Sequence, residues 1–142
     1  MKAVEVLMIV DNRGDVVLVE TAIERVGLPY HVTVVSDGAE AVEFLYRRGK
    51  YADSPRPELI LLDLKLPRKN GCEVLDEIQL DPVVKEIPLV LLSSSKSELK
   101  RSLAYGLPPQ CYLEKPSTFA GFLELVRAIE AFRDKALEAR QP

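Results

Sequence analysis

The sequence predicts an α/β fold, a doubly wound parallel sheet of five strands flanked by five helices. Five short apolar runs alternate along the 142 residues with five stretches that have the hydrophobic spacing of amphipathic helices. This alternation is typical of parallel sheets, because parallel neighbours need a crossover connection that is usually a helix. The run from Leu59 to Leu62 has no alternating polar positions, as expected for a strand that is buried on both faces.

The N-terminal half is expected to form a strand, a helix, a second strand, a second helix and a polar loop, at 4–10, 15–26, 31–35, 37–48 and 50–57. Gly27 and Gly49 follow the two helices, and glycine is the residue that most readily ends a helix. Ser36 and Asp37 stand at the start of the second helix, where their side-chain oxygens can accept hydrogen bonds from free backbone N–H groups.

The C-terminal half is expected to add three strand and helix pairs, at 58–62 and 71–80, at 88–92 and 97–105, and at 111–114 and 118–139. Asp81-Pro82 ends the first of these helices, because proline disfavours the helical conformation in the residue before it. The last helix carries apolar residues from Phe119 to Phe132 at helical spacing, which places most of them in the core. Residues 136–142 form a polar tail that is expected to fray.

Composition and charge indicate one globular domain over residues 1–142, with no output domain. Hydrophobic residues make up 47% of the chain, and the net charge of -3 gives no general attraction to nucleic acid or to anionic membranes. No apolar run approaches the ~20 residues needed to cross a bilayer, and the N-terminus leads into a strand without a signal peptide. We therefore expect a cytoplasmic protein, with Cys72 and Cys111 reduced.

Polar side chains follow the apolar runs at the carboxyl ends of four expected strands. Asp11 follows the first strand, Asp63 the third, Ser93 the fourth and Lys115 the fifth. In open α/β sheets the ligand site lies just outside these strand ends. Two carboxylates, a hydroxyl and an ammonium group are therefore expected to meet at one edge of the sheet.

These four groups together suit phosphoryl transfer. Two carboxylates form a hard oxygen site for Mg²⁺, and an aspartate can act as a nucleophile that takes up a phosphoryl group. An ammonium group and a metal ion can neutralise the phosphoryl oxygens, and a hydroxyl can donate to one of them. Taken alone, a strand-end aspartate is often only a helix cap, so the interpretation depends on all four groups occurring together.

The chain resembles, over essentially its whole length, the receiver domain of two-component response regulators. The resemblance rests on Asp11-Asn12, Asp63 with Pro67 and Gly71, Ser93, and Lys115-Pro116. It implies the flavodoxin-like, CheY-like strand order 2-1-3-4-5. It also implies a phosphoacceptor signalling protein rather than an enzyme, whose only chemistry is its own Mg²⁺-dependent phosphorylation and dephosphorylation.

The resemblance implies a role for each residue of the site. Asp63 is then the phosphoacceptor, and Asp11, Asp63 and the backbone carbonyl of Lys65 hold Mg²⁺. Lys115 is the lysine that binds the phosphoryl group, and the Lys115–Pro116 peptide bond is often cis in this family. Ser93 is the switch hydroxyl, and Tyr112 is the switch aromatic residue.

Several stretches look like one subgroup, the single-domain receivers that partner cyanobacterial and bacterial phytochromes. They are residues 11–16, the loop at 51–57 and the segment at 122–129 of the last helix. The partner implied is a sensor histidine kinase of the phytochrome type. A homodimer is also implied, through the face formed by helix 97–105, strand 111–114 and helix 118–139. Leu99, Leu103, Tyr105, Phe132 and Leu137 are the apolar residues expected to be left over for it.

The sequence departs from the receiver pattern at two positions. Receivers usually carry an acidic pair at the end of the first strand, and the first member is here Val10. The loss of a carboxylate predicts weak Mg²⁺ binding, and Lys65 adds a cation that competes with the metal. An alternative is therefore a receiver-like interaction module that takes no phosphoryl group. A metal-dependent phosphatase is disfavoured, because that chemistry needs an acid where Lys65 stands.

Overall fold

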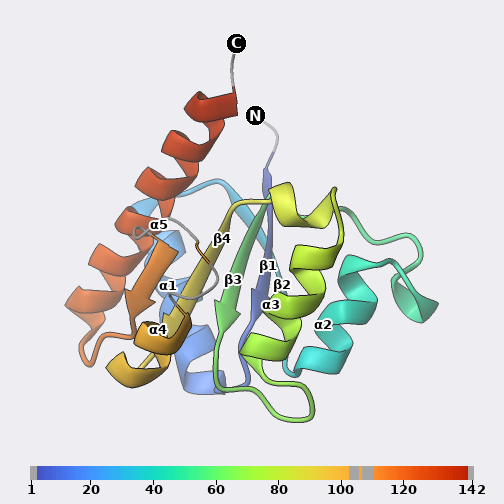
Figure 1. Cartoon of the computed structure of the whole chain (residues 1–142). Coiled ribbons are helices and arrows are strands. Elements are labelled where there is room, and N and C mark those ends of the chain that lie inside the picture. Colours follow the sequence, from blue (N-terminus) through green and yellow to red (C-terminus); the bar gives the residue numbers. More distant parts are fainter. Residues whose placement is uncertain (1–2, 103–105, 107–110, 141–142) are drawn as a thin grey trace.

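The computed structural model describes residues 3–102, 106 and 111–140, and it confirms the predicted fold (Figure 1). One parallel sheet has the strand order β2-β1-β3-β4-β5. Its strands are β1 (Val4–Ile9), β2 (Tyr30–Val35), β3 (Leu59–Asp63), β4 (Leu89–Ser93) and β5 (Tyr112–Glu114). Within the described residues, no helix is both long enough and apolar enough to cross a membrane.

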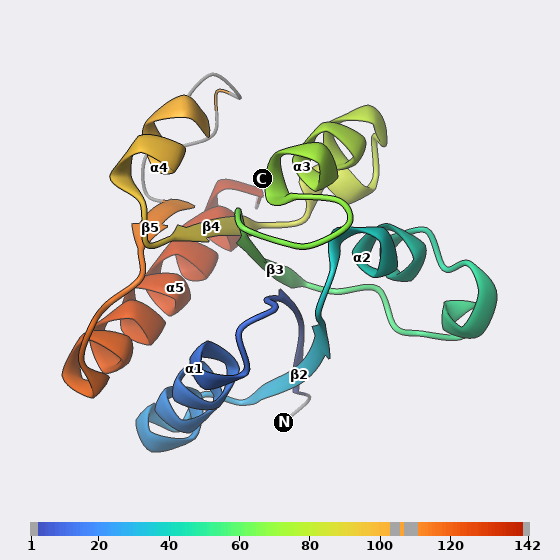
Figure 2. The same ribbon diagram turned by 90° about the horizontal axis from the view of Figure 1, so that it is seen from below.

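Helices cover both faces of the sheet, as the view along the strands shows (Figure 2). They are α1 (Arg13–Val26), α2 (Gly38–Leu45), α3 (Gly71–Leu80), α4 (Lys96–Ser102) and α5 (Phe119–Arg140), with short 3-10 turns η1 (Gly49–Tyr51) and η2 (Val84–Glu86). Helices α1 and α5 lie side by side on one face, and α2, α3 and α4 lie on the other. The chain is thus wound from a central strand toward both edges of the sheet.

The core consists of two apolar layers that the sheet separates. Successive side chains of β3 point to opposite faces, so Leu61 belongs to the layer under α1 and α5, and Leu62 belongs to the layer under α2 and α3. Both side chains are fully buried. Burial of each such side chain stabilises the fold by roughly 1.5–3 kcal/mol. This is why the run is continuously apolar up to Asp63.

Two helix ends differ from the prediction by two residues or more. Helix α1 begins at Arg13 rather than 15, because Asn12 is the N-cap and its side chain accepts from the Asp15 N–H at 3.0 Å. Helix α2 ends at Leu45 rather than 48, and Arg47 takes a left-handed conformation with φ of 54°. The predicted residues 103–105 of the fourth helix lie outside the described residues.

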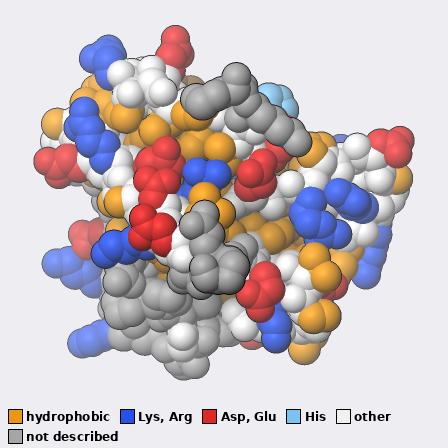
Figure 3. Space-filling model, turned by 90° about the horizontal axis from the view of Figure 1, so that it is seen from above, with side chains coloured by type: hydrophobic (Ala, Val, Ile, Leu, Met, Phe, Trp, Pro, Cys, Tyr) orange, Lys and Arg blue, Asp and Glu red, His pale blue; other side chains and the backbone are white. Residues whose placement is uncertain are grey.

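Helix α5 continues to Arg140, so the prediction that the chain frays from 136 was wrong for residues 136–140. Its last turns project past the amino-terminal end of the sheet (Figure 1). Leu137 lines an open groove there with Pro57, Ile87 and Pro88. Viewed from this end, hydrophobic side chains lie among charges of both signs (Figure 3).

Gly71 allows the segment that carries Asp63 to lie close against the start of α3. A Cβ atom at this position would meet the Leu64 Cα at 2.4 Å and the Asp63 carbonyl oxygen at 2.6 Å. The Gly71 N–H also donates to the Leu64 carbonyl at 3.0 Å. The absence of a side chain at Gly71 therefore sets how closely the end of β3 and the following helix approach.

Candidate functional site

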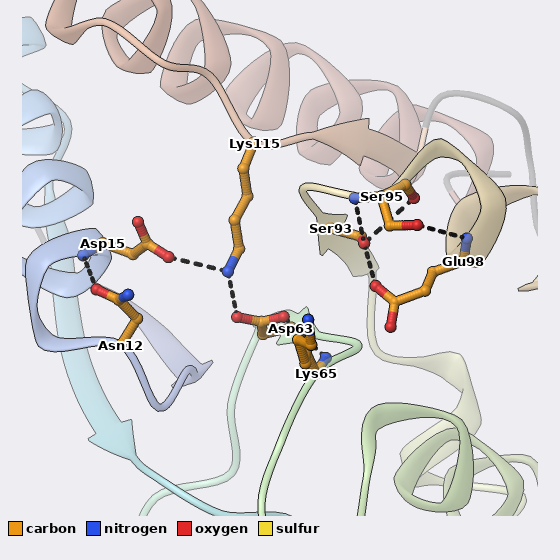
Figure 4. Close-up of polar contacts among 8 residues, drawn as sticks. All are labelled: Asn12, Asp15, Asp63, Lys65, Ser93, Ser95, Glu98 and Lys115. Atoms are coloured by element: carbon orange, nitrogen blue, oxygen red, sulfur yellow. Dashed lines mark hydrogen bonds and ion pairs between the residues drawn. The ribbon is translucent and has the colours of Figure 1, made fainter.

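The predicted site residues lie at the carboxyl ends of the strands. Asp63 is the last residue of β3 and is only 2% exposed. Ser93 is the last residue of β4, and it pairs in register with Glu114, the last residue of β5. Because β3 and β4 are also parallel and in register at Asp63 and Leu92, these strands end at one edge. Figure 4 shows that Asp63, Lys115 and Ser93 come together there.

One ammonium group bridges two carboxylates in the centre of the site. The Lys115 Nζ donates to Asp63 Oδ2 and also to Asp15 Oδ2, the latter at 2.9 Å. The other oxygen of Asp63, Oδ1, accepts the backbone N–H of Lys65 at 2.9 Å. Both oxygens of the buried carboxylate are therefore hydrogen-bonded, and the three charged side chains come from α1, β3 and the segment after β5 (Figure 4).

The pKa values of Asp63 and of Lys115 are both raised in the site, for different reasons. Burial raises the pKa of Asp63, and the hydrogen bonds from Lys115 and from the Lys65 N–H oppose this shift without cancelling it. Burial by itself lowers the pKa of Lys115, but its hydrogen bonds to Asp63 and Asp15 outweigh that effect and raise it. Lys115 therefore stays positively charged at neutral pH.

Ser93 is at the predicted edge, but its hydroxyl is engaged by α4. The side chain is 1% exposed, and its Oγ accepts the backbone N–H of Ser95 at 2.9 Å. The hydroxyl donates to the carboxylate of Glu98, and it also lies 3.3 Å from the Ser95 carbonyl oxygen. In this structure the hydroxyl of Ser93 is thus directed to the first turn of α4.

Tyr112 is half-buried in β5 and packs against the core layer under α2 and α3. It pairs in register with Leu91 of β4. With Leu99, Lys96, Ser97 and Lys100 it lines an open groove of about 440 Å³ between α4 and β5. Its predicted role as a switch aromatic stays a prediction.

The metal ligands predicted from the sequence are oxygen donors at the same edge. Asp11 is exposed just beyond β1, and Lys65 follows β3. Within the described ranges, no three His, Cys, Asp or Glu side chains gather closely enough to hold a metal ion. Two carboxylates and a carbonyl remain a donor set of the type that Mg²⁺ prefers, with fewer charges than a full acidic pair gives.

Val10 is 2% exposed and belongs to the apolar layer under α1 and α5. The position where receivers usually carry an acid is thus part of the core of this chain. The Lys115–Pro116 bond is trans, so the cis bond that the resemblance suggested is not present.

Two residues of the site were missed in the sequence analysis, Asp15 and Glu98. Asp15 looked like an ordinary acidic residue in a first helical turn, and only the fold brings it to Lys115 across 100 positions of sequence. A sequence signal did exist for Glu98. Ser95 and Glu98 have the Ser-x-x-Glu spacing of a helix-capping box at the start of a helix.

Comparison with known proteins identifies the family. The model of the response regulator receiver domain matches residues 6–127. The chain belongs to the response regulator receiver family. It is 39% identical over 127 residues to the response regulator Rcp1 of Synechocystis sp., covering 89% of this chain and 86% of Rcp1. The assignment of the chain as a receiver is thereby confirmed.

Solved structures of similar receivers have the same fold. The structure of the phosphorylated cyanobacterial phytochrome response regulator RcpA is 40% identical, with a TM-score of 0.82, over 92% of this chain and 93% of that one. The Mn²⁺-bound form of Rcp1 is 38% identical, with a TM-score of 0.79, over 90% of this receiver and 92% of Rcp1. The bacteriophytochrome response regulator RtBRR is 36% identical, with a TM-score of 0.77, over 89% of this chain and 78% of RtBRR.

The raised pKa of Asp63 predicts that Asp63→Asn increases the free energy of unfolding at pH 7. The folded state holds the proton more tightly than the unfolded state, so the buried carboxylate lowers stability when it is ionised. As the pH falls through the pKa of Asp63 in the folded state, Asp63 becomes protonated and the stability difference between Asp63→Asn and the wild type shrinks. The difference vanishes below the ordinary aspartate pKa of 3.8. Urea unfolding of both proteins from pH 7 to pH 3.5 or so measures this.

The exposed Asp76 on α3 gives the matched control, since Asp76→Asn removes a carboxylate that is not buried. Its effect is expected to stay within about 0.5 kcal/mol at neutral pH. A loss of stability in Asp63→Asn at pH 7 contradicts the prediction, because the ion pair with Lys115 then outweighs the cost of burial.

Proposed function

We propose that Asp63 accepts a phosphoryl group from the phosphohistidine of a sensor histidine kinase, so that the chain works as a phosphorylation-controlled switch. The observation that carries this proposal is the buried carboxylate of Asp63 at a strand end, in contact with the ammonium group of Lys115. In the reaction an Asp63 oxygen attacks phosphorus, and the bond from phosphorus to the histidine nitrogen breaks. Catalysis then needs little beyond positioning and neutralisation of charge.

Each neighbour has a role in this chemistry. Lys115 neutralises one phosphoryl oxygen, and the Ser93 hydroxyl donates to another once it leaves α4. Asp11, Asp63 and the carbonyl of Lys65 hold a divalent cation, proposed as Mg²⁺, which supplies further neutralisation when bound. The Mn²⁺-bound form of Rcp1, a similar receiver, supports the binding of a divalent cation. Binding is expected to be weak, because Val10 contributes no charge.

The proposed kinase partner is of the phytochrome type. Its support is the identity of 36–40% to phytochrome and bacteriophytochrome response regulators. Phosphohistidine in such kinases derives from ATP, so we place the receiver in the cytoplasm. Alignment over 92% of this chain and 93% of RcpA supports the assignment of residues 1–142 to one receiver domain.

A partner or a second copy is proposed to bind the face formed by α4, β5 and α5. The groove lined by Leu99, Lys100 and Tyr112 supports this choice. Leu103 and Tyr105, expected to contribute, lie outside the described residues. Phe132 packs against the core, so the prediction that it is available for association was wrong. Leu137 is 39% exposed.

Acetyl phosphate with Mg²⁺ is expected to add one phosphate to the wild type and none to Asp63→Asn, as measured by intact mass. Asp11→Asn serves as the second variant, because it keeps the phosphoacceptor and removes a metal ligand. Slower labelling is expected for it, still confined to Asp63. Phosphate on Asp63→Asn would refute the assignment. A wild type that takes up no phosphate favours the receiver-like interaction module, for which the buried Val10 is the supporting observation.

Val10→Asp is expected to tighten Mg²⁺ binding by on the order of tenfold, because it restores a carboxylate to the site. The same change places a charge in an apolar layer, so the free energy of unfolding is expected to fall by about 2 kcal/mol without Mg²⁺. Thermal unfolding over a Mg²⁺ titration measures both effects. Val10→Asn is the isosteric control, and equal tightening in that variant would show that charge is not the cause.

Lys100→Glu is expected to weaken self-association, since the residue is exposed beside the α4–β5 groove and the change reverses its charge. Sedimentation at tens of micromolar, with and without beryllofluoride, measures the mass of the species. Lys85→Glu in η2 makes the same charge change at an exposed position outside this groove. Equal monomer masses for all three proteins in both conditions would exclude the dimer.

A further inference from the structure

The start of α4 contains an N-cap with an unusual arrangement. The Ser95 side chain accepts the Glu98 N–H at 3.2 Å, and the Ser95 carbonyl accepts the Leu99 N–H at 3.2 Å, so Ser95 is the N-cap residue. In a capping box, the glutamate at the third helical position reaches back and accepts the N–H of the cap residue. Glu98 occupies this third position.

The box of α4 is open in this structure. The Ser95 N–H donates to the Ser93 Oγ, and the Ser93 hydroxyl donates to the Glu98 carboxylate, so Ser93 stands between the two halves of the box (Figure 4). Helix α3 shows the closed form in the same molecule. There the Asn70 side chain accepts the Glu73 N–H at 2.9 Å, and the Asn70 N–H donates to Glu73 Oε1 at 3.2 Å.

The hydroxyl of Ser93 has only one proton to donate. Its hydrogen bond to the Glu98 carboxylate is charge-assisted and therefore strong. While that bond exists, the hydroxyl cannot donate to a phosphoryl oxygen on Asp63. The negative charge of a phosphoryl group on Asp63 also repels the Glu98 carboxylate from its present position.

Once Glu98 no longer binds the Ser93 hydroxyl, its carboxylate can accept a hydrogen bond from the Ser95 N–H. Once the Ser93 hydroxyl rotates away, the Ser95 N–H is free to donate to the Glu98 carboxylate, as the Asn70 N–H does to Glu73. A cavity of about 270 Å³ lined by Glu98, Lys65 and Asn70 leaves room for the carboxylate to move. The exchange replaces the hydrogen bonds that it breaks.

We propose that Glu98 is a positioning residue that holds the Ser93 hydroxyl in the resting state, and that phosphorylation transfers the hydroxyl to the phosphoryl group and closes the Ser95–Glu98 capping box. This inference rests on the proposed phosphorylation of Asp63. The first turn of α4 is then a two-state element beside the groove that Leu99 and Tyr112 line. Phosphorylation thus changes the N-cap of α4 and, through it, the helix that lines this groove.

Beryllofluoride with Mg²⁺ is the probe for this proposal, because it mimics the phosphoryl group on an aspartate. Glu98→Ala is expected to bind it about tenfold more tightly than the wild type, since the competing charge-assisted hydrogen bond is gone. In a Ser93→Ala background the same change is expected to have less than about a twofold effect, because no hydroxyl remains to be released. Glu73→Ala, which removes the carboxylate of the closed box on α3, is expected to leave the affinity unchanged.

The double variant distinguishes a latch, meaning the hydrogen bond from the Ser93 hydroxyl to Glu98, from simple repulsion between Glu98 and beryllofluoride. Equal tightening by Glu98→Ala with and without the Ser93 hydroxyl would mean that only charge matters, and would overturn the proposal, as would no tightening at all. A wild type that binds no beryllofluoride refutes the proposed function instead. The contact between Ser93 and Glu98 is then judged by urea unfolding of the two single variants and the double variant. Coupled effects support the latch, and additive effects overturn it.

Discussion

The buried carboxylate of Asp63 is the group around which the site is arranged. A charge removed from water needs partners that replace its hydration, and the fold provides the Lys115 ammonium group and the Lys65 N–H. Both partners depend on the parallel sheet, because Asp63 and Lys115 are 52 positions apart and meet only where β3 and β5 end. The same geometry underlies the proposed reaction of this carboxylate with phosphorus. The features that stabilise its charge in the resting state are those that can stabilise a phosphoryl group.

The distribution of negative charge differs from that of a receiver with a full acidic pair. Val10 is packed in the core, and the second carboxylate in contact with Lys115 belongs to Asp15, in the first turn of α1. The negative charge near the lysine is thus supplied from a helix rather than from the end of β1. A carboxylate that binds the ammonium group from the side of α1 orients the lysine. This difference connects the apolar residue at Val10 with the weak metal binding proposed for the site.

The sequence was sufficient for the sheet, because continuous apolar runs and crossover helices restrict the topology strongly. It also placed Asp63, Ser93 and Lys115 at one edge, since each directly follows a strand and strand ends converge. It did not predict where side chains turn after they leave a strand. The direction of the Ser93 hydroxyl depends on Ser95 and Glu98, and these contacts exist only once α4 has its cap. The early end of α2 was likewise missed, because Arg47 adopts a left-handed conformation for which arginine carries no sequence signal.

The two edges of the sheet determine how copies of this protein can associate. Strand β5 has only three residues, Tyr112–Glu114, and it ends in a charged side chain. The other edge, β2, carries the exposed His31, whose Nδ1 lies 2.9 Å from the Glu5 carboxylate of β1. A strand as short as β5, ending in a charged side chain, is a poor template for backbone pairing with another sheet. Backbone pairing between copies through β5 is therefore disfavoured, and the self-association proposed above would use the side chains of α4 and α5 beside this edge, without extending the sheet from one copy to the next.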